Sequence, residues 1–369
     1  MSFLRCFPAV FVIGQEYEIL LNLKSFGICF LKIGKQIYFE NNTGVIPSER
    51  TIVKIRVPQK VLDREKGYTV VFRETEERKS YFSTFNPTQE QRFDFKSIEK
   101  KSDVHIYHIA DVHYRFEEAK KMASYFGEDT DLFIINGDIG EVETEDNFLE
   151  VCAFIGEISR GIIPVVFARG NHDARGRLAE LYPKYFPVDG NNTYFTFTIG
   201  NLNGVVLDCG EDKLDSSEEY DASKQVLREY RGINRFHIYR QQQLEFLKKV
   251  DFSSENKLTF AVSHMCPVKT TEEAGSVFDI ERDTYEKWNI ELERAGIKFM
   301  LCGHYHKAFV LHENDEISLI PHKYPIIVGS ALSLEGLMGA AIILNKDKME
   351  VCITNEEKKI IQAYEIMLK

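Results

Sequence analysis

The sequence predicts a layered α/β domain that follows a smaller β-rich domain. Before about residue 100 the chain holds only short runs of strand character separated by turn residues, whereas strands and helices alternate beyond it. The chain has 369 residues, and a single hydrophobic core stops growing at roughly 250–300 residues. We therefore expect two domains, residues 1–100 and residues 101–369.

The N-terminal residues predict a small β-sandwich of the fibronectin or immunoglobulin type. Four strand-like runs are present, namely Tyr17 to Leu23, Ile28 to Glu40, Thr51 to Val57 and Tyr68 to Arg73. No convincing helical period and no cluster of catalytic residue types accompanies them, so we interpret this part as a packing or recognition domain. The polar segment from Asn86 to Asp103 is expected to be the linker.

The second domain alternates strands with helices. Helical spacing is present in four segments, Phe116 to Phe126, Glu143 to Ile158, Gln241 to Val250 and Arg282 to Ala295. A strand pair at residues 194–198 and 204–207, followed by further strands after Tyr324, predicts a second sheet packed on the first. The polar segment from Glu211 to Arg240 is either a lid over a site or a surface excursion.

Five apolar runs end in Asp, Asn or His side chains. These polar ends are Asp111 and His113, Asp138, Asn171 with His172 and Asp173, His264, and finally His304 and His306. In an open α/β sheet, ligands bind beyond the carboxyl ends of the strands. The sequence therefore predicts one shared site, although each end taken alone is weak: Asp173, for example, could simply cap a helix from Ala174 to Leu181.

The donor atoms of these side chains suit divalent metals. Carboxylate oxygen, amide oxygen and imidazole nitrogen are present without a thiolate, a mixture that fits Mn, Fe, Zn, Co or Ni. The set is larger than one tetrahedral ion needs: Asp111, His113, Asp138, Asn171, His264, His304 and His306. Two metal ions that share a bridging carboxylate are the economical explanation.

The motifs Asp-x-His, Gly-Asp, Gly-Asn-His-Asp, a lone His and Gly-His-x-His follow in this order between Asp111 and His306. In this the chain resembles the calcineurin-like metallophosphoesterase superfamily, and the resemblance implies a two-sheet αββα sandwich. It also implies the ligand sets: Asp111, His113 and His306 for one metal, Asn171, His264 and His304 for the other, with Asp138 as the bridge.

The resemblance also implies roles outside the ligand set. His172 is expected to face the substrate, where it stabilises the transition state or protonates the leaving oxygen, and Asp173 is expected to orient that imidazole. Iron-containing purple acid phosphatases, which share the β-sandwich layout, carry Asp-x-Asp and a tyrosine three positions after the bridging Asp. Here the first motif ends in His113 and that later position is Glu141, so we expect no iron-tyrosinate centre.

The expected function is hydrolysis of a phosphomonoester or small phosphodiester by attack of a metal-bridging hydroxide. Two divalent ions, two carboxylates and the hydroxide leave about +1 on the centre, which attracts a phosphate anion. Arg169, Arg175 and Arg177 flank the third motif and could bind phosphate or a leaving group, or could be ordinary surface arginines. A nuclease and a non-catalytic scaffold are the alternatives, and the net charge of −11 disfavours nucleic acid as a partner.

The cysteines and the N-terminus favour a cytoplasmic protein. Seven widely spaced cysteines include no Cys-x-x-Cys pair, which is typical of reduced thiols rather than of a disulfide framework. The apolar stretch from Cys6 to Ile13 is too weak for a signal peptide, and no segment predicts a membrane span. His105 and His108 lie inside the first strand of the second domain and are interpreted as packing residues. The sequence defines no oligomeric state.

Overall fold

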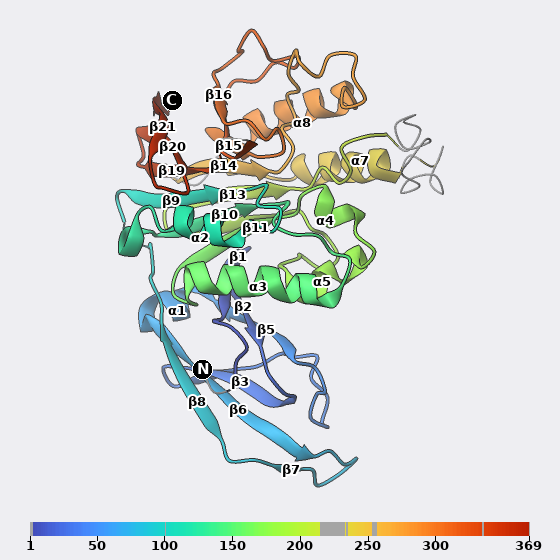
Figure 1. The fold of residues 1–369 in the computed structure, drawn as a ribbon, viewed down its shortest axis with the longest axis vertical. Coiled ribbons are helices and arrows are strands. Elements are labelled where there is room, and N and C mark those ends of the chain that lie inside the picture. Colours follow the sequence, from blue (N-terminus) through green and yellow to red (C-terminus); the bar gives the residue numbers. More distant parts are fainter. Residues whose placement is uncertain are drawn as a thin grey trace.

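The computed structural model describes residues 3–99, 101–214, 233, 235–252, 257–333 and 336–368. Its strands form three sheets, two of them stacked with helices on their outer faces (Figure 1). Most of the segment from Glu211 to Arg240, for which a lid was one interpretation, lies outside the described residues. Among the described residues no helix is both long and apolar enough to cross a lipid bilayer.

The first sheet has ten strands. Its order is β21 (Ile360–Met367), β20 (Lys348–Asn355), β19 (Gly336–Leu344), β9 (Val104–Ile109), β10 (Leu132–Asn136), β11 (Pro164–Ala168), β1 (Ala9–Ile13), β2 (Glu16–Asn22) and β5 (Ile52–Pro58), with β18 (Ala331–Ser333) paired to β19. Strands β9, β10, β11 and β1 run parallel. Their carboxyl ends therefore lie along one edge of the sheet.

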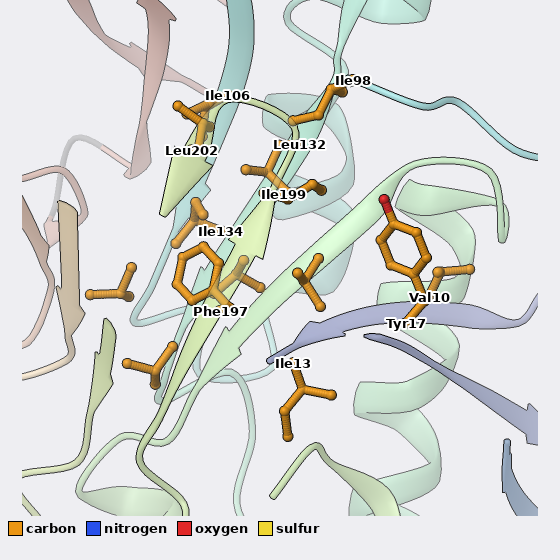
Figure 2. Close-up of a cluster of buried hydrophobic side chains, with 14 of the residues drawn as sticks. Val10, Ile13, Tyr17, Ile98, Ile106, Leu132, Ile134, Phe197, Ile199 and Leu202 are labelled. Carbon is orange, nitrogen blue, oxygen red and sulfur yellow. The ribbon is translucent and has the colours of Figure 1, made fainter. Parts of the chain in front are cut away.

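The second sheet has six strands and stacks on the first. Its order is β12 (Phe195–Ile199), β13 (Leu202–Leu207), β14 (Leu258–Ser263), β15 (Phe299–Cys302), β17 (Ile326–Val328) and β16 (Phe309–Leu311). Figure 2 shows part of the core between the sheets, where Ile134 of the first sheet lies near Phe197 of the second, and Ile106 near Leu202. Burial of such apolar area is the main favourable term in folding.

Helices cover the outer face of each sheet. On the first sheet these are α2 (Phe116–Ala123) and α3 (Glu145–Ser159), and on the second α7 (Arg235–Leu247) and α8 (Arg282–Arg294). The shorter helices are α4 (His172–Arg175), α5 (Tyr182–Tyr185), η1 (Gly127–Asp129) and η2 (Ala179–Leu181). Helix α3 begins with a capping box in which the Thr144 hydroxyl oxygen accepts from the backbone N–H of Asn147. The predicted αββα sandwich is confirmed.

The N-terminal residues form two layers of strands, as the predicted sandwich requires. One layer is the third sheet, with β4 (Gln36–Tyr38), β3 (Gly27–Ile33), β6 (Gly67–Glu77), β7 (Thr84–Phe85) and β8 (Gln89–Asp94), and the short helix α1 (Gln59–Glu65) lies beside it. The other layer is β2 and β5, whose side chains share one core with β3 and β6. That second layer belongs to the ten-stranded sheet, because β1 pairs in parallel with β11. The sheet thus runs across the domain boundary that we predicted at residue 100.

Two sequence expectations are wrong in detail. The proposed linker from Asn86 to Asp103 contains β8, which pairs with β6 over six residues. Most residues of β8 are polar, so its composition resembles that of a linker. Phe93 and the following Phe95 are nevertheless buried. The alternative in which Asp173 caps a helix from Ala174 to Leu181 does not hold for one continuous element: α4 ends at Arg175, before Gly176 takes an extended conformation.

A candidate dinuclear metal centre

The predicted polar side chains meet at the carboxyl ends of strands from both stacked sheets. At least one of these polar side chains follows within three residues of the end of β9, β10 and β11 in the first sheet and of β14 and β15 in the second. Four of the residues are almost fully buried: Asp111, Asp138, Asn171 and His264. His304 and His113 are partly buried and His306 is exposed, so the cluster reaches from the core to the surface.

The loops that carry Asp138 and Asn171 touch through two glycines. A Cβ atom on Gly137, whose φ is 79°, would lie 2.5 Å from the Cα atom of Gly170. A Cβ atom on Gly170 would lie 2.1 Å from Oδ1 of Asp138. Any side chain at either position would push the two loops apart, since real Cβ contacts are never this short. Both motifs therefore need glycine before the polar residue.

Asp111, His113 and His306 form the first ligand cluster. Nε2 of His113 lies 3.3 Å from Nε2 of His306, which in turn lies 3.5 Å from Oδ1 of Asp111. One ligand atom from each residue falls within 4.8 Å of the others. The cluster combines residues 193 positions apart in the sequence, because β9 and β15 belong to different sheets.

Asp138, His264 and His304 form the second ligand cluster, again within 4.8 Å. Nε2 of His264 lies 3.1 Å from Oδ2 of Asp138, while its Nδ1 lies 2.6 Å from the carbonyl oxygen of Asn136. The second contact fixes the ring so that Nε2 faces the cluster. The side-chain oxygen of Asn171 lies 3.0 Å from Nδ1 of His304 and belongs to the same group.

Asp138 lies between the two clusters. Its Oδ2 is 3.1 Å from His264 and 4.0 Å from Nε2 of His172, and it forms a further group with His113 and His172. Its Oδ1 accepts from the backbone N–H of His172 at 2.9 Å. The geometry thus gives Asp138 contacts on both sides, as a bridging carboxylate requires.

The charges of the cluster fit bound cations. Among the described residues, no Lys or Arg nitrogen lies within 4.0 Å of Asp111 or Asp138, and the buried Oδ1 of Asp111 has no hydrogen-bond partner. An unpaired buried carboxylate costs several kcal/mol. Burial opposes the charged form of His264, but attraction to Asp138 and Asp111 outweighs it and raises the pKa of His264 to about 10. The site attracts positive charge, and its O and N donors fit divalent ions.

The Asn171 amide gives independent support for this fit. Its oxygen atom lies 3.2 Å from the carboxylate Oδ2 of Asp138, 3.2 Å from Nε2 of His264 and 3.0 Å from Nδ1 of His304. Amide orientation is assigned from the surrounding hydrogen bonds, and without a cation the NH₂ group would be favoured at this position. An oxygen here is favourable when a cation lies among these atoms.

His172 lies at the open side of the cluster. Its side chain is 36% exposed, its ring stands edge-on to His113 at 5.0 Å, and Nη1 of Arg175 lies 3.5 Å from its Nε2. Burial, together with the positive charge of Arg175, lowers the pKa of His172, although Asp138 opposes the shift. The imidazole can therefore reach a bound substrate, which the deeply buried His264 cannot.

Asp173 does not orient His172 as we expected. Its Oδ2 accepts from the backbone N–H groups of Gly170 at 2.8 Å and Asp138 at 3.2 Å. Among the described residues it makes no hydrogen bond to the His172 ring. The carboxylate instead joins the two glycine-containing loops, because it accepts from the backbone of both. It therefore contacts the backbone of Asp138. Burial and the charge of Asp138 raise the pKa of Asp173 to about 7.

Sequence reasoning missed three residues around the site. Ser330 donates to Oδ2 of Asp111 at 2.9 Å and to the carbonyl oxygen of Ala110 at 2.8 Å. It follows the apolar run of β17 and Gly329, so the same strand-end pattern that revealed the ligands would have found it. Asn136 lies on β10, and its amide donates to the carbonyls of Ser263 and Leu301 and so joins the two sheets. No local pattern signals that role.

The third missed residue, Asp212, connects His304 to Arg175. Its Oδ2 lies 3.9 Å from Nε2 of His304, and its Oδ1 accepts from Nη2 of Arg175 at 2.5 Å. Glu211 accepts from the same guanidinium at 2.5 and 2.7 Å. By contrast, His105 and His108 are packing residues, since His105 stacks on Phe126 and His108 is fully buried beside Asn136.

The αββα sandwich is consistent with a metallophosphoesterase fold, and the cluster at its strand ends holds candidate metal ligands. The model of the calcineurin-like phosphoesterase family matches residues 104–308, more than half of the chain. The chain therefore belongs to the calcineurin-like phosphoesterase family. The matched residues include all seven candidate ligands.

Solved structures share the fold at low sequence identity. A purple acid phosphatase, PPD1, from yellow lupin (Lupinus luteus) seeds has a TM-score of 0.62 and 11% identity, over 98% of this chain and 74% of its own. PhoD has a TM-score of 0.55 and 12% identity, over 98% of this chain and 88% of its own. The likeness therefore includes the N-terminal strands, and it concerns the fold alone. No curated protein matches the sequence.

Proposed function

We propose that this protein is a dinuclear metal-dependent phosphoesterase that hydrolyses a phosphomonoester or a small phosphodiester. The observation that carries the proposal is the pair of buried carboxylates, Asp111 and Asp138, surrounded by imidazole and amide groups and by no Lys or Arg side chain of the described residues. Such a pair needs positive charge inside the protein. Membership of the calcineurin-like phosphoesterase family supports the same reaction class.

Seven residues would hold the two ions. Asp111, His113 and His306 would bind one, Asn171, His264 and His304 the other, and Asp138 both, with Mn, Fe, Zn, Co or Ni as candidates. Two such ions supply charge for the phosphoryl oxygens and lower the pKa of a water molecule between them. The chain's own residues then have to orient the ester and supply a proton to the leaving oxygen.

His172 is the proposed proton donor to the leaving oxygen. It faces the open side of the cluster, and the hydrogen bond from its backbone N–H to Asp138 fixes its position relative to the bridge. Positioned acids of this kind contribute about 10²–10⁴-fold to a rate. Asp173 is a positioning residue in this proposal, because it acts on the loops of Gly170 and Asp138 rather than on the substrate.

A small phosphoester fits the charge of the protein better than nucleic acid does. The net charge is −11, and binding to a phosphate backbone depends on several Lys and Arg contacts. All seven cysteines are free, which supports a proposed cytoplasmic location. The iron-tyrosinate centre of purple acid phosphatases is not part of the proposal, since Glu141 stands at the tyrosine position.

The test compares 4-nitrophenyl phosphate with bis(4-nitrophenyl) phosphate as substrates. Full-length protein is stripped with a chelator, reloaded with Mn(II) and assayed beside Asp111→Asn and the matched surface control Asp129→Asn. We expect hydrolysis that depends on metal, persists in the control and is lost in Asp111→Asn. Hydrolysis that survives chelation would contradict the metal requirement. Two bound ions without hydrolysis of either ester would indicate a narrow substrate filter, whereas a protein with neither bound metal nor hydrolysis would favour a scaffold.

A further inference from the structure

The two carboxylate oxygens of Asp111 have different surroundings. Its Oδ2 accepts a hydrogen bond from the backbone N–H of His304 at 2.9 Å and another from the hydroxyl of Ser330 at 2.9 Å. Its Oδ1 is buried without a hydrogen-bond partner among the described residues, 3.7 Å from Nε2 of His264 and 3.5 Å from Nε2 of His306. One oxygen is therefore held by the protein, whereas the other faces an imidazole from each ligand cluster.

Ser330 lies where the chain crosses from one stacked sheet to the other. It comes two residues after β17 of the second sheet and directly before β18, which pairs with β19 of the first. The residue before it is Gly329, and a Cβ atom at that position would lie 2.5 Å from Nδ1 of the buried His108 on β9. Because the crossing is packed this closely against β9, the backbone at Ser330 is fixed beside the end of that strand.

The hydroxyl of Ser330 has one proton and two possible acceptors. Its Oγ lies 2.9 Å from Oδ2 of Asp111 and 2.8 Å from the carbonyl oxygen of Ala110. A hydrogen bond to an ionised acceptor is about twice as strong as one between neutral groups, so the carboxylate competes better for the proton when Asp111 is charged. Ser330 is fully buried, and the hydroxyl is the group that the protein itself supplies there.

Two hydrogen bonds from different segments fix the rotation of the Asp111 carboxylate. The torsion that turns a carboxylate about its Cβ–Cγ bond has a broad energy minimum, so the side chain does not choose its own orientation. The N–H of His304 reaches Oδ2 from the loop after β15, and the hydroxyl of Ser330 reaches it from the loop after β17. Rotation of the carboxylate would break both bonds at once, which keeps Oδ1 on the side of the cluster.

We propose that Ser330 is a positioning residue for the metal centre, because its hydroxyl holds Oδ2 of Asp111 and so directs Oδ1 to a bound ion. The inference rests on the proposed function, in which Asp111, His113 and His306 bind that ion. The N–H of His304 is a backbone group that a substitution leaves in place, whereas the hydroxyl of Ser330 can be removed. Partners that orient a metal ligand in this way typically contribute about 10–100-fold to metal affinity.

Titration of the metal-free full chain with Mn(II) tests this role without an activity assay, since electron paramagnetic resonance reports the free ion. The matched control is Ser159→Ala, which removes a fully buried hydroxyl that donates to the carbonyl of Ile155 in α3. We expect wild type and control to bind two ions alike, and Ser330→Ala to bind one of the two about tenfold more weakly. Ser330→Cys leaves almost no cavity and offers only a weak donor, so it should weaken the same ion, and thiolates have little preference for Mn(II). Circular dichroism verifies that each variant is folded.

The same titration in an Asp111→Asn background tests whether Ser330 acts through the carboxylate. That background keeps the ligands of the other ion, and adding Ser330→Ala to it should change the affinity for this ion by less than about twofold. Wild-type Mn(II) affinities in Ser330→Ala, or an equal loss with and without the Asp111 carboxylate, would overturn the proposal. Weaker Mn(II) binding in Ser330→Ala of a protein that hydrolyses no ester would refute the proposed function alone. Metal-dependent hydrolysis with unchanged Mn(II) binding would refute the positioning role alone.

Discussion

The two ends of β10 carry the same buried side chain in opposite surroundings. Asp131 precedes the strand and is fully buried, and its Oδ1 lies 2.9 Å from Nζ of both Lys96 and Lys101. Asp138 follows the strand and is 1% exposed, yet the side chains nearest its Oδ2 are the imidazoles of His264 and His172. At one end the protein supplies its own cations, whereas at the other it supplies candidate metal ligands.

The backbone conformation of Asp138 also differs from that of Asp131, and other candidate ligands share the conformation of Asp138. Five of the seven candidate ligands have positive φ: Asp111 (53°), His113 (44°), Asp138 (55°), His304 (75°) and His306 (54°). Asp131 does not. A non-glycine residue in this region costs about 1–3 kcal/mol, and such strain persists where the surrounding structure fixes it for function. The comparison teaches that the buried charge at the amino end is paired within the protein, whereas at the carboxyl end it lies among candidate metal ligands in strained backbone.

The largest expected effect comes from neutralising Asp138. Asp138→Asn removes the charge shared by both ligand clusters, so we expect the loss of bound metal and a fall in phosphoester hydrolysis of about 10³-fold or more, equivalent to about 4 kcal/mol. Metal content by mass spectrometry and the rate with 4-nitrophenyl phosphate are the measurements.

Asp131→Asn is the matched control at the other end of β10. It breaks the pairs with Lys96 and Lys101, so we expect the free energy of unfolding to fall by about 2–3 kcal/mol while metal content and kcat stay near wild type. If Asp131→Asn lost metal to the same extent as Asp138→Asn, the result would contradict the different roles assigned to the two aspartates.

The next largest effect separates proton donation from metal binding. His172→Ala is expected to keep both ions and to lower kcat by about 10²-fold, because it removes the proposed donor and none of the ligands. His105→Ala, a half-buried histidine in the same sheet that stacks on Phe126, should leave kcat unchanged. A metal-free His172→Ala protein would show instead that His172 is itself a ligand.

The pH dependence of stability tests the buried carboxyl at Asp173 in the metal-free chain. An unfolded Asp titrates near pH 4, whereas burial and the charge of Asp138 raise the pKa of folded Asp173 to about 7. Between these pH values the folded chain binds the additional proton, so this group makes the free energy of unfolding fall as pH rises from about 4 to about 7.

Asp173→Asn removes that titration and keeps an oxygen for the Gly170 and Asp138 N–H groups. We expect the variant to gain stability relative to wild type as pH rises through this window, by on the order of 2 kcal/mol, measured by urea unfolding. Parallel stability profiles for the two proteins would contradict the raised pKa.

The smallest effect is expected on the third sheet. Lys32 and Glu90 form an ion pair at 2.6 Å between β3 and β8, but their side chains are 44% and 47% exposed. Water screens such pairs, so Glu90→Gln should change the free energy of unfolding by less than about 0.5 kcal/mol and leave kcat unaltered. A change as large as that of Asp131→Asn would mean that this sheet also depends on its charges.

The clustering of the candidate ligands could be predicted from the sequence because its signal is local. Each stands shortly after an apolar strand, and strand ends at one edge of a sheet lie close together, as for the loops of His113 and Asp138, which follow β9 and β10. The same reasoning would have reached Ser330. It could not give the contact of Asp173, because that carboxylate bonds to a loop 35 positions away and no pattern distinguishes it from a helix cap.

The local sequence pattern also did not indicate which strands belong to each sheet. Strand β1 inserts beside β11, and β8 pairs with β6, through backbone hydrogen bonds that do not depend on side-chain type. The composition of β8 therefore resembles that of a linker. In the same way, a cavity beside α4 combines Arg175, Glu211 and Arg235 from three segments, and only the folded chain brings them together.

The sequence alone indicated which polar side chains converge at the strand ends, because periodicity and strand ends are properties of neighbouring residues. The tertiary structure alone decided what each charge does. Asp131 and Asp138 are the same residue at the two ends of one strand, and their different roles follow from Lys96 and Lys101 near one and His264 near the other. Electrostatic energy depends on distances in space, which a one-dimensional pattern does not contain.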